Sequence, residues 1–206
     1  MVTATTTHTT KDNITWARLV SNLLSPPVIW GTLAFPIAFR EASSQEQGLI
    51  WALTYVVLVC VMPAFYIGLM VWRGHITDLH MRVRTQRIRP FIVSIICTAI
   101  AWAALSVMQA PPLLPAFALI TVIQITAMLF ITLVWQISMH TMSITSAIIT
   151  SAALFGIGTA ILASPLIPIV GAARYSLRRH TLSQLIGGSM LGGMMTLALI
   201  VLTNVF

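Results

Sequence analysis

The sequence predicts an all-α protein, a polytopic bundle of six to seven transmembrane helices. The chain has 206 residues, of which 58% are hydrophobic and only 7% are charged. A soluble domain carries about 25% charged residues, so the bilayer is the solvent for most of this chain. Long apolar runs without alternation of polar and apolar residues favour helices over a β-barrel. We therefore expect a multi-pass integral membrane protein.

Two parts are expected along the chain. Residues 1–25 form an N-terminal part, and residues 26–206 form the transmembrane bundle. The first 13 residues lack the compact apolar core of a signal peptide and predict a disordered tail. Residues 14–25 place apolar and polar side chains on opposite sides of a helix, which predicts an amphipathic segment at the membrane surface.

Seven apolar runs follow in the bundle. The first and the sixth are short and contain prolines, among them Pro36 and Pro165, so six complete spans remain an alternative. The predicted spans cover residues 26–40, 48–72, 91–108, 113–135, 141–156, 159–173 and 181–205.

Basic residues are distributed unevenly between the two ends of this predicted bundle. Of the 11 lysines and arginines, only Arg40 falls on the side of the linkers near 41–47, 109–112 and 157–158. The other ten fall on the opposite side, which the positive-inside rule places in the cytoplasm. We expect a plasma-membrane protein with this basic face in the cytoplasm.

Acidic residues and cysteines are scarce, and this limits the reactions and the bound metals that the sequence can support. Reactions that need paired aspartate-rich motifs to hold magnesium are excluded, and no metal site or cofactor is expected. Cys60 and Cys97 fall inside apolar runs, so no disulfide is expected. The net charge of +7 comes from short loops between spans and does not indicate a nucleic-acid partner. The four acids are Asp12, Glu41, Glu46 and Asp78.

Three polar stretches are predicted to emerge on the same face, because two helical hairpins separate them. They cover residues 82–90, 138–140 and 173–184. In the last stretch, His180 and Gln184 are one helical turn apart. His180 also lies at the start of a predicted helix, where exposed N–H groups favour an anion.

The other two stretches also place a histidine or an arginine at the start of a predicted helix. Ser138 is a candidate N-cap beside His140, and Pro90 fits the first turn of a helix that Arg89 precedes. Arginine presents a planar fork of donors that suits phosphate oxygens. Together the stretches predict a phosphate site in which a histidine attacks phosphorus and arginines stabilise the transition state.

The three stretches resemble the motifs of the type 2 phosphatidic acid phosphatase superfamily in order and spacing. The family pattern is Lys-x6-Arg-Pro, then Pro-Ser-Gly-His, then Ser-Arg-x5-His-x3-Asp. This chain has Arg82-x6-Arg89-Pro90, then Ile137-Ser138-Met139-His140, then Ala173-Arg174-x5-His180-x3-Gln184. The resemblance covers residues 82–188 and implies an integral membrane lipid phosphatase that works through a phosphohistidine without a cofactor.

The resemblance also implies roles for single residues. His180 would be the nucleophile and His140 the general acid. Gln184 stands where the family has the aspartate that orients the nucleophile, and Asp78 is a candidate for supplying the missing carboxylate. Met139 stands where the family has glycine. The implied phosphate ligands are Arg82, Arg89, Arg174 and Ser138.

Polyprenyl phosphates or pyrophosphates and phosphatidate-type phospholipids are the implied substrates, with membrane lipids as the surrounding partners. The sequence leaves a homodimer open. Two alternatives to hydrolysis remain, a lipid phosphotransferase on the same site and a catalytically degenerate protein that binds lipid phosphates. Gly188-x3-Gly192 is interpreted as helix packing within the bundle. Four further arginines are interpreted as interfacial anchors: Arg84, Arg87, Arg178 and Arg179.

Overall fold

The computed structural model describes residues 6–78, 81 and 83–203, with the side chains of 15–78, 81 and 83–202. This part of the chain forms helices and no strand, which confirms the predicted all-α polytopic fold. Among the described residues, 6 helical segments are long and apolar enough to cross a membrane, and the apolar helix Met139–Phe155 is shorter. The predicted number of six to seven spans is therefore confirmed.

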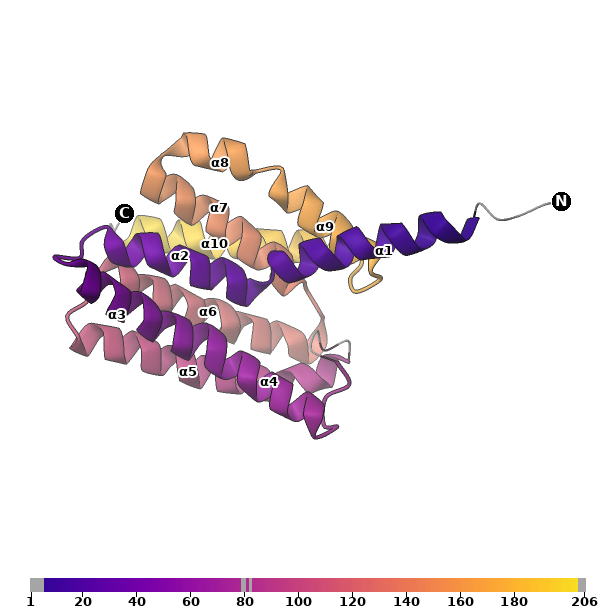
Figure 1. Cartoon of the computed structure of the whole chain (residues 1–206), viewed down its shortest axis with the longest axis horizontal. Helices are drawn as coiled ribbons and strands as arrows, with labels where there is room; N and C mark the ends of the chain where they lie inside the picture. Colours follow the sequence, from indigo (N-terminus) through magenta and orange to yellow (C-terminus); the bar gives the residue numbers. More distant parts are fainter. Residues whose placement is uncertain (1–5, 79–80, 82, 204–206) are drawn as a thin grey trace.

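The helices run back and forth along one bundle axis (Figure 1). The first half of the chain contains α1 (Thr6–Leu23), α2 (Pro26–Phe39), α3 (Gln45–Tyr55), the π-helical η1 (Val56–Val61) and α4 (Met62–Trp72). The second half contains the 3-10 turn η2 (Arg84–Arg87), α5 (Ile88–Val107), α6 (Leu113–Val134), α7 (Met139–Phe155), α8 (Ile157–Ala163), α9 (Leu166–Ser176) and α10 (Leu182–Thr203).

Prolines explain where these segments bend. Pro26 and Pro27 begin α2 directly after α1 ends, and Pro165 separates α8 from α9. Pro63 cannot donate a backbone hydrogen bond and follows η1, where the pattern of hydrogen bonds is π-helical. The first and sixth apolar runs are therefore parts of longer bent segments, which explains why each looked short in the sequence.

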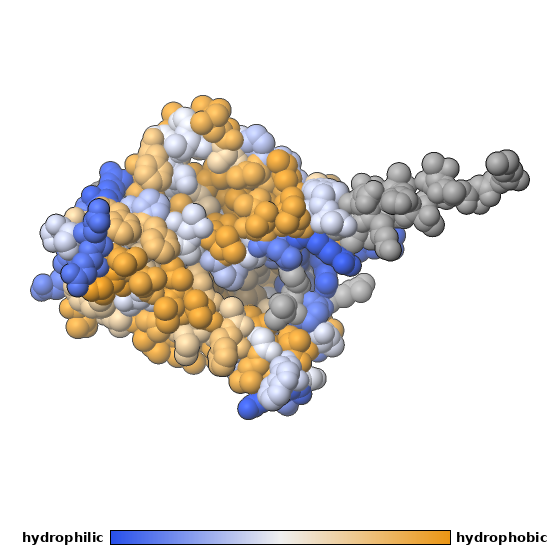
Figure 2. Space-filling model, viewed as in Figure 1, coloured by the Kyte–Doolittle hydropathy of each residue, from blue (hydrophilic) through white to orange (hydrophobic). Residues whose placement is uncertain are grey.

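The α4–α5, α6–α7 and α9–α10 connections all lie at the end of the bundle from which α1 extends (Figure 1). The three polar stretches therefore emerge on one face, as the sequence predicts. Hydrophilic residues gather toward the two ends of the bundle and apolar residues cover its sides, as a membrane protein requires (Figure 2).

The N-terminal helix adds packing that the sequence interpretation did not include. The last turns of α1 pack against α9. Ala17 and Ser21 are buried in this contact, whereas Leu19 and Leu23 are exposed. The segment predicted to lie along the membrane surface is thus the end of a helix that joins the bundle.

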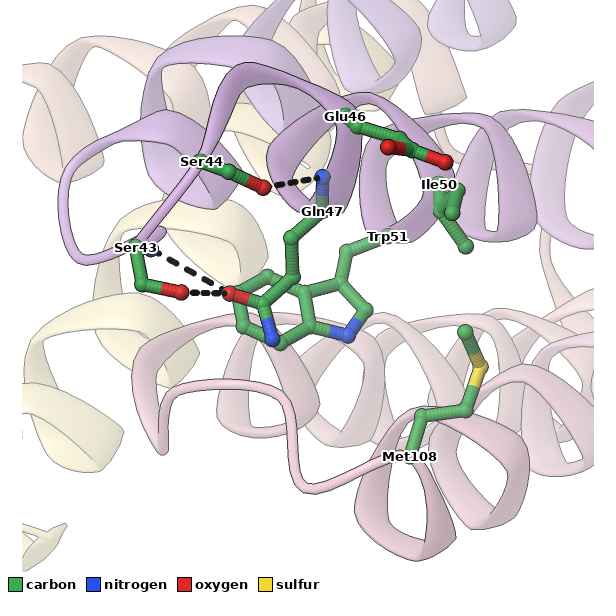
Figure 3. Close-up of a pocket in the computed structure, with 7 residues that line it drawn as sticks. All are labelled: Ser43, Ser44, Glu46, Gln47, Ile50, Trp51 and Met108. Carbon is green, nitrogen blue, oxygen red and sulfur yellow. Dashed lines mark hydrogen bonds between the residues drawn. The ribbon is translucent and has the colours of Figure 1, made fainter.

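The opposite end of the molecule carries a shallow depression beside the start of α3 (Figure 3). Ser44 Oγ accepts a hydrogen bond from the Gln47 backbone N–H at 3.1 Å, and Gln47 Oε1 accepts from the Ser43 hydroxyl at 2.6 Å. These bonds cap the helix. The single ionisable side chain that lines the depression is Glu46, so its charge does not suit an anion.

Two glycines of α10 allow close contact with α7. A Cβ atom at Gly188 would collide with the Ser138 carbonyl oxygen, and one at Gly192 would collide with the Met142 carbonyl oxygen. The approach also brings the Thr141 hydroxyl within 2.9 Å of the Leu185 carbonyl oxygen. Packing within the bundle is therefore the role of this glycine pair, as predicted.

Replacing either glycine should destabilise the bundle. Gly188→Ala or Gly192→Ala forces a methyl group against backbone, which costs about 1–3 kcal/mol in a packed interior. The apparent melting temperature in detergent should fall accordingly. Gly68→Ala is the matched control, because nothing lies within 4 Å of a Cβ at that position. Equal melting temperatures for Gly188→Ala and Gly68→Ala would contradict the packing argument.

Candidate functional site

A cavity of about 410 Å³ opens at the end of the bundle where the three connections meet. Two arginines and two histidines converge on it from different segments: Arg87, His140, Arg174 and His180. The rest of its wall is largely apolar and includes Pro27, Val59, Pro63, Ala64, Ile67 and Phe91. The cavity thus combines basic side chains with a largely apolar wall.

His180 is oriented by the first turn of α10. Gln184 Oε1 accepts a hydrogen bond from the Thr181 backbone N–H at 3.1 Å, and Thr181 Oγ1 accepts from the Gln184 N–H at 3.4 Å. This reciprocal pair is a capping box of the Thr-x-x-Gln type. The same Gln184 oxygen lies 3.3 Å from His180 Nδ1. One amide therefore caps the helix and orients the imidazole.

The imidazole of His180 is neutral over the physiological pH range. Burial lowers the pKa of His180 from 6.5 to about 3, and the positive charges of Arg174 and Arg87 act in the same direction. Hydrogen bonds with Gln184 and with the Gln136 backbone oppose this shift only in part. Because a neutral imidazole has a free electron pair, His180 has the protonation state that a nucleophile needs.

The turn before His180 is a Schellman motif at the end of α9. The Arg178 N–H donates to the Tyr175 carbonyl at 2.8 Å, and the Arg179 N–H donates to the Arg174 carbonyl at 3.1 Å. Arg178 has a φ of 51°, in the left-handed region that glycine usually occupies at this position. The turn reverses the chain so that Arg174 and His180 reach the same cavity.

Arg174 is only 2% exposed. Its Nη1 donates to Ser21 Oγ of α1 at 2.7 Å. Its Nε is buried without a hydrogen-bond partner among the described residues. An arginine that lines a cavity with an unsatisfied donor favours an anionic ligand there.

His140 also contacts Ser21. Its Nε2 lies 3.1 Å from the Ser21 carbonyl oxygen and 3.4 Å from the Ser21 hydroxyl. Because a carbonyl oxygen only accepts, this contact requires the proton on Nε2. Ser138, fully buried behind His140, caps α7 by accepting from the Thr141 N–H at 3.4 Å, as the N-cap prediction requires.

The first motif differs most from the sequence interpretation. Arg87 is 6% exposed, lines the cavity and donates from Nε to the Met81 carbonyl at 2.9 Å. Its interpretation as an interfacial anchor is therefore wrong. Arg89 is exposed and is not part of the cavity wall, although Pro90 is. Arg82 lies outside the described residues.

The remaining predicted residues have other partners. Asp78 forms an ion pair with Arg179 at 3.2 Å, next to His180 in the chain. Arg84 donates to the Leu133 carbonyl at 2.6 Å, at the end of α6. Thus Arg179 and Arg84 bind protein oxygens, and the carboxylate of Asp78 lies beside an arginine.

Sequence reasoning missed Arg87, Ser21 and the role of Thr181. The Thr181-x-x-Gln184 signature of a capping box was present and could have been found. No local pattern marked Ser21, which meets His140 and Arg174 across 119 and 153 residues of chain.

The low pKa of His180 makes stability depend on pH. Between pH 6.5 and about 3 the unfolded chain binds a proton at His180 that the folded chain does not. The contribution of His180 to the free energy of unfolding is fully present above pH 6.5. It decreases as the pH falls toward 3. We expect the melting temperature in detergent to fall over this range, and His180→Asn to reduce that fall. The same pH dependence in both proteins would contradict the burial of a neutral His180.

Comparison of the chain with protein-family models, with curated proteins and with solved structures found no match. The resemblance to the type 2 phosphatidic acid phosphatases therefore stays a prediction based on three motifs. What the site can do chemically has to be argued from the cavity itself.

Proposed function

We propose that the protein is a membrane-embedded lipid-phosphate phosphatase that forms a phosphohistidine at His180 without a metal. The observation that carries this proposal is the convergence of Arg87, Arg174, His140 and His180 on one cavity whose remaining wall is largely apolar. This arrangement suits a ligand that has an anionic head and an apolar tail.

The proposed reaction has two steps. The unprotonated nitrogen of neutral His180 attacks phosphorus, the bond to the lipid oxygen breaks, and protonated His140 donates a proton to the departing alkoxide. Water then attacks the phosphohistidine while His140 accepts a proton from it, the phosphorus–nitrogen bond breaks, and inorganic phosphate leaves with His180 and His140 back in their starting states. Arg87 and Arg174 stabilise the negative charge on the phosphate oxygens in both transition states.

The apolar part of the cavity wall suggests how a lipid substrate is held. Residues of α2, η1, α4 and α5 line it, so part of the lipid tail rests against apolar side chains while the head reaches the arginines. Polyprenyl phosphates or pyrophosphates and phosphatidate-type lipids have this form. In this proposal the protein works in the plasma membrane with the site on the cytoplasmic face, as the distribution of basic residues favours.

Two alternatives each rest on a specific observation. Met139 lines the cavity where the family has glycine, and a side chain that limits water would favour transfer of the phosphoryl group to another alcohol. Gln184 is neutral and engaged in the capping box, so it supplies no charge to stabilise a histidinium. That second feature favours a protein that binds lipid phosphates without turnover.

Release of phosphate from purified protein tests the proposal. With farnesyl phosphate, farnesyl pyrophosphate and phosphatidate, we expect phosphate release that survives a chelator and disappears in His180→Ala, because only a nucleophilic histidine is required. Product that appears only when an acceptor alcohol is added would identify a transferase. If folded protein binds these lipids but forms no product, it is a protein that binds lipid phosphates without turnover.

Two neighbouring arginines provide a matched test of the site geometry. Arg87→Gln removes a charge that lines the cavity and should lower kcat/KM by about 100-fold, the loss typical of one transition-state donor. Arg89→Gln removes an exposed charge and should change kcat/KM by no more than about twofold. Steady-state kinetics with farnesyl phosphate measures both. A larger loss in Arg89→Gln would contradict the assignment of Arg87 to the site.

A further inference from the structure

Ser21 joins the N-terminal helix to two donors that line the cavity, Arg174 and His140. Its hydroxyl accepts from Arg174 Nη1 at 2.7 Å, and its carbonyl oxygen lies 3.1 Å from His140 Nε2. The side chain of Ser21 is 1% exposed. A single residue of α1 thus contacts both a proposed phosphate ligand and the proposed general acid.

The end of α1 makes the Ser21 carbonyl available for this contact. In a continuing helix that carbonyl would accept from the N–H four residues later, at Ser25. The Ser25 N–H instead donates to Asn22 at 3.3 Å, and Pro26 begins the next helix. The Ser21 carbonyl is therefore one of the last-turn acceptors that need a partner outside the helix.

The hydroxyl contact also determines which side of the Arg174 guanidinium faces a ligand. Ser21 occupies Nη1, whereas Nε has no partner among the described residues and Arg174 lines the cavity. An arginine binds two phosphate oxygens in parallel through neighbouring N–H groups. With Nη1 occupied, the side of the fork that carries Nε remains for the phosphate.

We propose that Ser21 is a positioning residue of the phosphate site, which fixes the guanidinium of Arg174 so that its Nε side binds phosphate. This proposal rests on the proposed function for the identity of the ligand. It assigns to α1 a role in the site, although α1 lies outside the three motifs. Ser21 itself does not touch the phosphate.

A double-mutant cycle tests this role. Farnesyl phosphate in detergent is the probe, and binding and kcat are measured separately for wild type, Ser21→Ala, Arg174→Gln and the double variant. Ser106→Ala, which removes an exposed hydroxyl of α5, is the control for loss of a serine. Ser21→Cys, similar in size with a weak acceptor, replaces Ser21→Ala if that variant does not fold.

We expect Ser21→Ala to weaken binding about tenfold, in the range of a hydrogen bond to a charged group. The same substitution should have no further effect in the Arg174→Gln background, and Ser106→Ala should match wild type. Unchanged or tighter binding by Ser21→Ala, or an equal loss in both backgrounds, would overturn the positioning role.

The same measurements separate this proposal from the proposed function. If Arg174→Gln weakens binding and Ser21→Ala does not, the role of Ser21 fails and the phosphatase proposal stands. If the cycle shows coupling but no protein releases phosphate, Ser21 positions Arg174 in a binding protein. If wild type neither binds nor cleaves the probe, both proposals fail.

Discussion

Burial of two guanidinium groups at one end of an apolar bundle is the constraint on which the site depends. Arg87 and Arg174 are 6% and 2% exposed, and they donate to a backbone carbonyl and to a serine hydroxyl, both neutral. A buried charge is costly unless opposite charge or strong hydrogen bonds compensate it. The acidic partner described nearby, Asp78, is in an ion pair with Arg179. The negative charge of Asp78 also acts on Arg87 and Arg174, and an anionic group in the cavity would add to this compensation.

The short turn between α9 and α10 fixes how Arg174 and His180 are placed relative to each other. A Schellman motif ends α9 at Ser176 and a capping box at Thr181 starts α10, so His180 is held between two hydrogen-bonded turns. Gln184 suits the capping box, which uses Glu or Gln at its third helical position. The amide orients the imidazole without adding negative charge, in keeping with a His180 pKa lowered to about 3.

The fold could be read from the sequence because its determinants are local. Apolar runs marked the spans and prolines marked the bends, and hairpin counting placed three polar stretches on one face. Sequence reasoning identified cavity residues only where they lie in or directly beside the connections between helices, as His140, Arg174 and His180 do. In the first motif, the 3-10 turn before α5 sets the rotation of the segment, which turns Arg87 inward and Arg89 outward. Spacing along the chain does not specify that rotation.

Ser21 could not be predicted from the sequence for a different reason. Its partners, His140 and Arg174, are far from it in the chain and are brought close only by tertiary packing. The three motifs span residues 82–188, yet the hydrogen bonds of Arg174 and His140 lead to a helix that ends at Leu23. The geometry of the cavity therefore depends on how α1 packs against α9. The prolines that begin α2 contribute to this, because they end α1 where the Ser21 carbonyl can face His140. The N-terminal helix is thus as much a part of the site as the motifs that first indicated it.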